Sequence, residues 1–147
     1  MSGGPDQFAV DVLLIEDDPG DAAMVTQTFA LTNKDCRCHV VADGAAGLRF
    51  LRRDGEFTEA PPPQLILLDL GLPALSGLDV LAAIKSDPKL MLIPVVVLSG
   101  SQHPDDIQRS YRLHANAYVV KPADFDGLAE AIRKISSTFL GLVRAPG

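Results

Sequence analysis

Apolar and polar positions divide the chain into short segments of two kinds. Five apolar runs are bounded by Gly, Pro or polar residues and are too short for helices, which is typical of strands buried on both faces. The stretches between them carry apolar residues at helical spacing. The expected strands are residues 10–15, 37–41, 65–69, 95–98 and 117–120.

Helix start signals lie between these runs. Asp18 followed by Pro19 is an N-cap with proline at the first helical position. Ser76 and Asp79 have capping-box spacing, and acidic residues after Pro104 suit the positive end of a helix dipole. The expected helices begin near residues 19, 44, 76, 104 and 124, and the last extends to about residue 143. The side chains expected to face the core are Ala22, Val25 and Phe29, then Ala45, Leu48 and Leu51, and then Leu78, Leu81 and Ile84.

Strict alternation of strands and helices predicts one α/β domain, with a doubly wound, five-stranded parallel sheet and helices on both faces. Strand order 2-1-3-4-5 is the natural candidate. Residues 52–63 are polar and end in prolines, and we interpret them as a surface loop because the strand pattern resumes at once. We expect a disordered leader over residues 1–9, the domain over 10–143 and a tail over 144–147, with no output domain.

Composition narrows the class of partner. A formal net charge of −6 and a pI near 4.9 argue against nucleic-acid binding, which needs a basic surface, and favour cations and basic partners over anionic membranes. No apolar run reaches the roughly 18 residues of a membrane helix. The N-terminal residues lack the basic and apolar regions of a signal peptide, so we expect a cytoplasmic protein.

The two cysteines, Cys36 and Cys38, lie one residue apart beside His39. A metal site would need a fourth ligand at a suitable spacing, and none is present. Alternate residues of a strand share a face, so we interpret both cysteines as reduced, packed thiols.

Polar residues with chemical potential follow four of the five expected strands. Glu16 and Asp17 follow the first strand, Asp69 ends the third, Ser99 follows the fourth and Lys121 the fifth. Ligands of such sheets bind outside the carboxyl ends of the strands, so these side chains are expected to converge. Carboxylates about 5 Å apart repel by roughly 3 kcal/mol per pair at an effective dielectric of 20. A hard cation such as Mg²⁺, for which Mn²⁺ can substitute, would relieve this repulsion, and the hydroxyl and ammonium suit a phosphoryl group.

In these residues the chain resembles the receiver domain of bacterial two-component response regulators. The matching motifs are IEDD (15–18), LLDLGLPALSG (67–77), VVVLSGS (95–101) and YVVKP (118–122). The resemblance implies that Asp69 accepts a phosphoryl group from a sensor histidine kinase. It also implies that Glu16 and Asp17 bind Mg²⁺ together with Asp69, with the backbone carbonyl of Gly71 as a further ligand.

The same resemblance assigns the remaining site residues. Ser99 matches the hydroxyl that binds the phosphoryl group, and Lys121 matches its ion-pair partner. Tyr118 falls at the aromatic switch position, where it would follow Ser99 and change the surface formed by the fourth helix, fifth strand and fifth helix. The bond between Lys121 and Pro122 would be the family's cis peptide.

A closer similarity is to the stand-alone regulators encoded beside bacterial phytochromes, seen in the APPP loop, residues 86–122 and the last helix. Gly71 and Ser101 occupy variable positions that are expected to influence the lifetime of the phosphoryl group. Ala74 and Leu75 replace polar residues common in the family, which leaves the partner contacts of that loop open.

The last expected helix carries an apolar stripe at the spacing of a helix seam. Its members are Phe125, Leu128, Ile132, Ile135, Phe139 and Leu142. The first half is expected to pack on the sheet, whereas a helix of about 19 residues, roughly 28 Å, would extend past strands of this length. We favour a homodimer contact over kinase docking alone for the C-terminal patch, which comprises Phe139, Leu140, Leu142 and Val143.

Three other functions fit the sequence less well. An aspartyl-phosphate hydrolase needs a second Asp two residues after the nucleophile, where this chain has Gly71. A flavodoxin-like cofactor binder needs a hydroxyl-rich phosphate loop, where this chain has EDDPGD (16–21). A degenerate receiver that only binds proteins is the remaining alternative, and the complete set of acids, serine and lysine argues against it. The chain is therefore expected to be a signalling domain that catalyses at most its own phosphorylation and slow autodephosphorylation.

Overall fold

The computed structural model describes residues 10–32 and 35–140, in which strands and helices alternate throughout. The strands are β1 Val10–Ile15, β2 Cys36–Val41, β3 Leu65–Leu68, β4 Val95–Ser99 and β5 Ala117–Val120. The helices are α1 Pro19–Thr32, α2 Gly44–Arg52, the 3-10 helix η2 Gly55–Phe57, α3 Gly77–Ser86, α4 Pro104–Arg112 and α5 Phe125–Phe139. Each strand lies within one residue of its predicted bounds.

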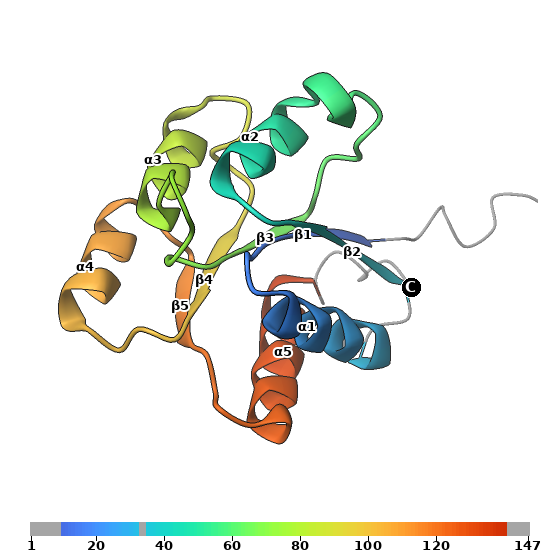
Figure 1. Cartoon of the computed structure of the whole chain (residues 1–147), viewed down its shortest axis with the longest axis vertical. Coiled ribbons are helices and arrows are strands. Elements are labelled where there is room, and N and C mark those ends of the chain that lie inside the picture. Colours follow the sequence, from blue (N-terminus) through green and yellow to red (C-terminus); the bar gives the residue numbers. More distant parts are fainter. Residues whose placement is uncertain (1–9, 33–34, 141–147) are drawn as a thin grey trace, which may run out of the picture.

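The five strands form one parallel sheet in the order β2-β1-β3-β4-β5. Figure 1 shows α1 and α5 on one face of this sheet and α2, α3 and α4 on the other. The predicted fold class and strand order are therefore confirmed. Because all five strands run in the same direction, their carboxyl ends meet at a single edge of the sheet.

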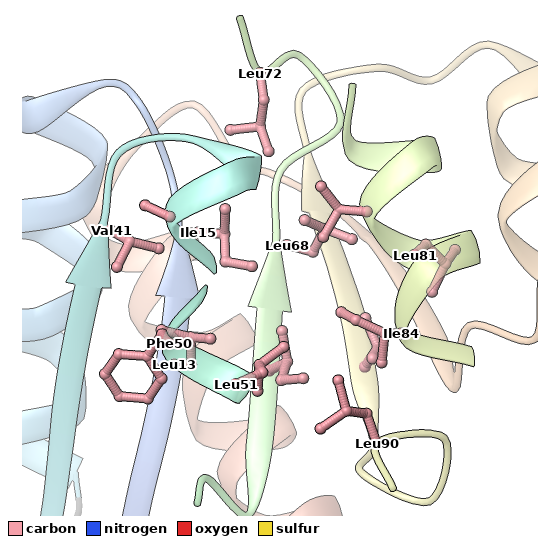
Figure 2. Close-up of a cluster of buried hydrophobic side chains, with 14 of the residues drawn as sticks. Leu13, Ile15, Val41, Phe50, Leu51, Leu68, Leu72, Leu81, Ile84 and Leu90 are labelled. Atoms are coloured by element: carbon pink, nitrogen blue, oxygen red, sulfur yellow. The ribbon is translucent and has the colours of Figure 1, made fainter. Parts of the chain in front are cut away.

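Two apolar layers hold the helices against the sheet, because successive side chains of each strand point to opposite faces. Leu13 and Ile15 of β1 belong to the cluster beneath α2 and α3, which Figure 2 shows in close-up. Val12 and Leu14 belong to the other cluster, beneath α1 and α5. All four are at most 2% exposed, so β1 is rigidly fixed in the centre of the sheet. At about 25 cal/mol per Å² of apolar surface, each such side chain contributes roughly 1.5–3 kcal/mol.

The inward-facing residues of two helices differ from the prediction. In α2 Ala45 is exposed, and Phe50 is buried in its place, with its ring centroid 5.4 Å from those of His39 and Phe57. In α3 Leu78 is only half-buried, whereas Val80 is fully buried. Predicted positions Ala22, Val25, Phe29, Leu51, Leu81 and Ile84 are buried. The large ring of Phe50 fills the space beside β2 better than a methyl group could, and this sets the rotation of α2.

The connection over residues 52–63 is more than a surface loop. It contains η2, and its Phe57 packs against the core beside Phe50. Ala60 and Pro63 are buried as well. These apolar contacts anchor the loop to the sheet, although its charged residues face solvent.

The last helix also departs from the prediction. Leu140, expected in an exposed patch, is 0% exposed and belongs to the cluster beneath α1 and α5. Phe139 is half-buried against the same cluster. Leu142 and Val143 lie outside the described residues. Leu140 keeps a right-handed helical conformation, with its backbone N–H bonded to the carbonyl of Ser136, and its side chain packs in the apolar layer beneath α1 and α5.

Cys36 and Cys38 are free thiols packed against the apolar layer beneath α1 and α5. Burial raises the pKa of Cys36 to about 11 and that of Cys38 to about 12, so both stay protonated near neutral pH. Their interpretation as packed thiols is confirmed. No helix in the described ranges is both long and apolar enough to cross a bilayer.

Candidate functional site

Backbone hydrogen bonds of the sheet hold the candidate site residues at its carboxyl edge. The N–H of Asp69 donates to the carbonyl of Ile15 at 3.1 Å, which ties the end of β3 to the end of β1. The N–H of Lys121 donates to the carbonyl of Ser99 at 2.7 Å, which ties β5 to β4. The convergence expected from the strand ends is therefore built into the sheet itself.

Three carboxylates meet at this edge. One oxygen from each of Glu16, Asp17 and Asp69 lies within 4.8 Å of the others. Glu16 is buried, Asp69 half-buried and Asp17 exposed, so the cluster is enclosed by protein at Glu16 and open to solvent at Asp17. Such a spacing of like charges costs about 3 kcal/mol per pair at an effective dielectric of 20, and less where water screens Asp17. An all-oxygen donor set with room for water fits a hard divalent cation such as Mg²⁺.

Lys121 is the cation of the site and is shared by two carboxylates. Its Nζ donates to Glu16 Oε1 and to Asp21 Oδ2, both at 2.8 Å. Burial lowers the pKa of Lys121, but the hydrogen bonds that its ammonium donates to Asp21 and Glu16 outweigh burial and hold the pKa above its ordinary value. Lys121 is therefore fully charged at neutral pH.

Glu16 has a raised pKa in spite of this partner. Burial is the largest cause, and the nearby charge of Asp69 acts in the same direction. The hydrogen bonds from Lys121 and from the backbone N–H of Asp18, at 3.1 Å, oppose the rise without cancelling it. The carboxylates of the site thus outnumber its cation, Lys121, and the site has a surplus of negative charge.

Asp21 was not identified from the sequence. It lies in the first turn of α1, where an acidic side chain also suits the positive end of the helix dipole. Read alone, such a residue is a helix-start signal. Its second role arises only because the turn after β1 brings the beginning of α1 beside Lys121.

A pocket of about 420 Å³ opens at the end of β3 and β4. It is lined by Asp69, Leu70, Gly71, Ser76, Leu78, Ser99, Gly100, Ser101, Asp106 and Lys121. The pocket therefore brings together the carboxylate, the hydroxyl and the ammonium singled out in the sequence. It has room for a phosphoryl group beside Asp69.

The loop after β4 is organised by Ser101. Its N–H donates to Ser99 Oγ at 3.3 Å, and its carbonyl accepts from the hydroxyl of Tyr118 at 2.8 Å. Tyr118 is half-buried against the core beneath α2 and α3. The two positions assigned to a switch are thus connected through a single residue between them.

The loop after β3 is shaped by backbone requirements next to Asp69. A Cβ at Gly77 would lie 2.3 Å from the carbonyl oxygen of Asp69, so the start of α3 can approach β3 only with glycine. A Cβ at Gly71 would lie 4.0 Å from Asp69 Oδ2, which leaves space for a side chain beside the carboxylate. Ala74 has a φ of 63°, a left-handed conformation that disfavours alanine.

The expected cis peptide is not found. The described residues contain no cis peptide bond, so Lys121 and Pro122 are joined in the trans form. The trans form of such a bond is the more stable by about 0.5–1 kcal/mol in the absence of other constraints. The placement of Lys121 described above is reached with this trans bond.

Comparisons with known proteins agree with this geometry. The response regulator receiver domain model matches residues 12–133. The response regulator Rcp1 of Synechocystis sp. (strain ATCC 27184 / PCC 6803 / Kazusa) is 40% identical over 135 residues, which is 92% of each chain. The phosphorylated cyanobacterial phytochrome response regulator RcpA superposes with a TM-score of 0.88 at 40% identity, over 95% of this chain and 99% of that one. The Mn²⁺-bound form of Rcp1 gives 0.85 at 39% identity, over 94% and 99%.

Proposed function

The chain belongs to the response regulator receiver domain family, and on that premise we propose that Asp69 is its phosphoacceptor. The observation that carries this proposal is the shared pocket, which places Asp69 together with Ser99 and Lys121 and beside the acid cluster. The phosphoryl donor is a phosphohistidine of a sensor histidine kinase. The similarity to Rcp1 and RcpA supports a kinase of the phytochrome type.

In the proposed transfer, an Asp69 oxygen attacks phosphorus while the bond from phosphorus to the donor nitrogen breaks. The electron pair of that bond leaves with the imidazole. Glu16, Asp17 and Asp69, with the carbonyl of Gly71, would hold Mg²⁺ or Mn²⁺, which supplies charge neutralisation when bound. Lys121 would exchange a carboxylate partner for a phosphoryl oxygen, so its role changes from counter-ion to ligand of the new anion. The chain thus promotes its own phosphorylation and is a signalling protein.

The proposed output begins at Ser99. A phosphoryl group on Asp69 would accept a hydrogen bond from the Ser99 hydroxyl, which at present accepts from the N–H of Ser101. Because Tyr118 is bonded to the carbonyl of Ser101, displacement of this loop would reach Tyr118 and the face made by α4, β5 and α5. The predicted switch therefore has a continuous path of contacts.

The partner surfaces follow from the same face. A groove of about 490 Å³ lies between β5 and α5, with Val119, Ile135 and Phe139 in its lining. We propose that homodimerisation uses the Phe139 end of this groove. Leu140 does not contribute to this contact, because its side chain is buried in the core. The net charge of −6 supports protein partners over nucleic acid and membrane surfaces, and we place the protein in the cytoplasm with its kinase.

Incubation with phosphoramidate and Mg²⁺, followed by intact mass spectrometry, tests the phosphoacceptor. The parent is expected to gain one phosphate-sized adduct that EDTA prevents and that Asp69→Asn lacks. Asp126→Asn, which removes an exposed carboxylate of α5, is the control and should be modified like the parent. If the parent gains nothing with phosphoramidate or acetyl phosphate, the chain acts only as a protein-binding module.

A further inference from the structure

A further carboxylate lines the pocket beside Asp69. Asp106 lies in the first turn of α4, is half-buried and contributes to the same pocket as Ser99 and Lys121. It does not belong to the three-carboxylate acid cluster. An acid is unexpected on the wall of a pocket proposed to receive an anion, so its placement and its charge need an explanation.

Asp106 is held in this position by the loop after β4. The hydroxyl of Ser101 donates to Asp106 Oδ2 at 2.5 Å and accepts from the N–H of His103 at 3.2 Å. The N–H of Asp106 is bonded to the carbonyl of His103 at 3.0 Å, as the first turn of α4 closes. The carboxylate is therefore directed by both its side chain and its backbone, and it cannot turn to solvent without breaking the bond to Ser101.

The charge of Asp106 is not matched by an ion pair in the part of the chain that the structure describes. Within the described ranges, no Lys, Arg or His side chain forms an ion pair with it, and its side-chain partner is the neutral hydroxyl of Ser101. Lys121, the cation of the pocket, is bonded to Glu16 and Asp21. A donor that enters this pocket therefore meets a fixed negative charge on the α4 side.

We propose that Asp106 is a specificity-determining residue that favours phosphoryl donors with a neutral leaving group over donors with an anionic one. This inference rests on the proposed function of Asp69. In-line displacement sends the leaving group away from Asp69 and out through the pocket, past its walls. A negative wall repels a departing anion and does not repel a departing amine.

The two kinds of donor differ in the bond that breaks and in the charge that the leaving group carries. With either donor, an Asp69 oxygen forms the new bond to phosphorus. From phosphoramidate the P–N bond breaks, and the nitrogen, which already carries its proton, leaves with the electron pair as neutral ammonia. From acetyl phosphate the P–O bond breaks, and acetate takes both the electron pair and a negative charge. A protein phosphohistidine whose other ring nitrogen is protonated resembles phosphoramidate, because its imidazole then leaves with the electron pair as a neutral group.

The experiment compares initial phosphorylation rates of the full chain with phosphoramidate and with acetyl phosphate at saturating Mg²⁺. Asp106→Asn keeps the side chain's size and its ability to accept from Ser101 but removes the charge. We expect it to raise the rate with acetyl phosphate roughly three- to tenfold and to change the rate with phosphoramidate by less than about twofold, the range for one unit charge in a half-open pocket. Asp105→Asn is the matched control: Asp105 lies in the same helical turn, is exposed and does not line the pocket, so the rate ratio should stay at the parent value.

Ionic strength provides a second measurement that does not depend on a variant. The parent's preference for phosphoramidate should shrink as salt rises from about 20 mM to about 500 mM, because the shorter Debye length screens the Asp106 charge. The same titration on Asp106→Asn should change the ratio by a smaller factor than in the parent, because only the charges outside Asp106 remain to be screened. If Asp106→Asn does not fold, a salt-independent ratio in the parent overturns the inference.

Other outcomes separate this inference from the function on which it rests. Equal ratios in Asp106→Asn and Asp105→Asn overturn the role of Asp106 while Asp69 remains the phosphoacceptor. Equal slowing with both donors in Asp106→Asn also overturns it, because the residue would then only support the loop that holds Ser99. Absence of any adduct with either donor overturns the proposed function and this inference together.

Discussion

Strand β1 carries a buried carboxylate near each end, and the two differ in the charge around them. Asp11 is 5% exposed and Glu16 is 4% exposed, so both have lost nearly all contact with water. Asp11 accepts two hydrogen bonds from Arg37, at 3.0 and 3.2 Å, and lies 2.9 Å from the ring of His39. Glu16 shares a single lysine with Asp21 and has Asp17 and Asp69 within 4.8 Å.

Charge balance therefore distinguishes the structural carboxylate, Asp11, from the carboxylate of the candidate site, Glu16. At the amino edge of the sheet, Arg37 and the ring of His39 both contact one acid, Asp11, and hold β2 against β1. At the carboxyl edge, acids outnumber the cation, and the surplus attracts a divalent cation. Lysines show the same contrast. Lys85 is bonded to the carbonyls of Met91 and Ile93 and burial lowers its pKa, whereas carboxylates raise the pKa of Lys121.

The largest expected effect comes from Asp69→Asn, which should abolish phosphorylation and at the same time stabilise the metal-free fold. Removing one of three mutually repelling charges should raise the free energy of unfolding by about 1–2 kcal/mol without Mg²⁺. Urea denaturation with and without Mg²⁺, beside intact mass, measures both effects. A fall in stability in the absence of metal would contradict the surplus of charge.

The opposite result is expected at the other end of β1. Asp11→Asn should lower the free energy of unfolding by about 2 kcal/mol, because Arg37 loses a charged acceptor and one of its two hydrogen bonds, and should leave the phosphorylation rate unchanged. Urea denaturation and the phosphoramidate assay measure the two quantities. Glu130→Gln removes the exposed ion pair with Arg133 and should leave both nearly unchanged. A slower phosphorylation in Asp11→Asn would break the contrast between the two ends.

The pH dependence of stability should report on the burial of Glu16. Burial raises the pKa of Glu16, so the folded chain binds this proton more tightly than the unfolded chain. The contribution is fully present below the ordinary pKa of glutamate and is lost as pH rises through the raised value. Metal-free urea midpoints measured between about pH 4 and 7 should therefore decline less in Glu16→Gln than in the parent. An identical decline in both would show that Glu16 ionises as it does in the unfolded chain.

The smallest expected effect concerns backbone strain. Ala74, Arg53 and His114 all have positive φ, but only Ala74 lies in a loop at the carboxyl edge, between Asp69 and α3. Replacement of each by glycine should raise the free energy of unfolding by about 0.5 kcal/mol, since the relief of strain exceeds the entropy lost. Thermal melting checks this gain, and phosphorylation rates should change in Ala74→Gly alone. Equal rates in all three variants would show that strain in this loop does not influence the site.

The convergence of side chains at the ends of the strands could be predicted from the sequence. Glu16, Asp69, Ser99 and Lys121 each follow or end a short apolar run, and parallel strands bring such ends together whatever the helices do. The fold class and strand order follow from the same alternation. A direct reading of residue patterns was therefore sufficient for the centre of the site.

What the sequence did not predict depends on how helices are rotated and how loops close. Asp21 and Asp106 resemble ordinary acids in a first helical turn. Only the packed position of α1 brings Asp21 to Lys121, and only that of α4 brings Asp106 to the pocket. Leu140 was expected in an exposed patch beside Phe139, but its side chain is buried in the core. Burial of Phe50 in place of Ala45 likewise reflects ring packing, which helical spacing does not specify.

The close contact at Gly77 has a consequence for how this loop can vary. The N–H of Gly77 is bonded to the carbonyl of Leu70 at 3.1 Å, and the absence of a Cβ lets the start of α3 lie directly against Asp69. This hydrogen bond therefore closes the loop between Leu70 and Gly77 at its base. Substitutions at the exposed residues Pro73 and Ala74 can be exchanged among relatives, or by design, to alter partner recognition while Asp69 keeps its position, whereas Leu72 packs in the core and Leu75 against it.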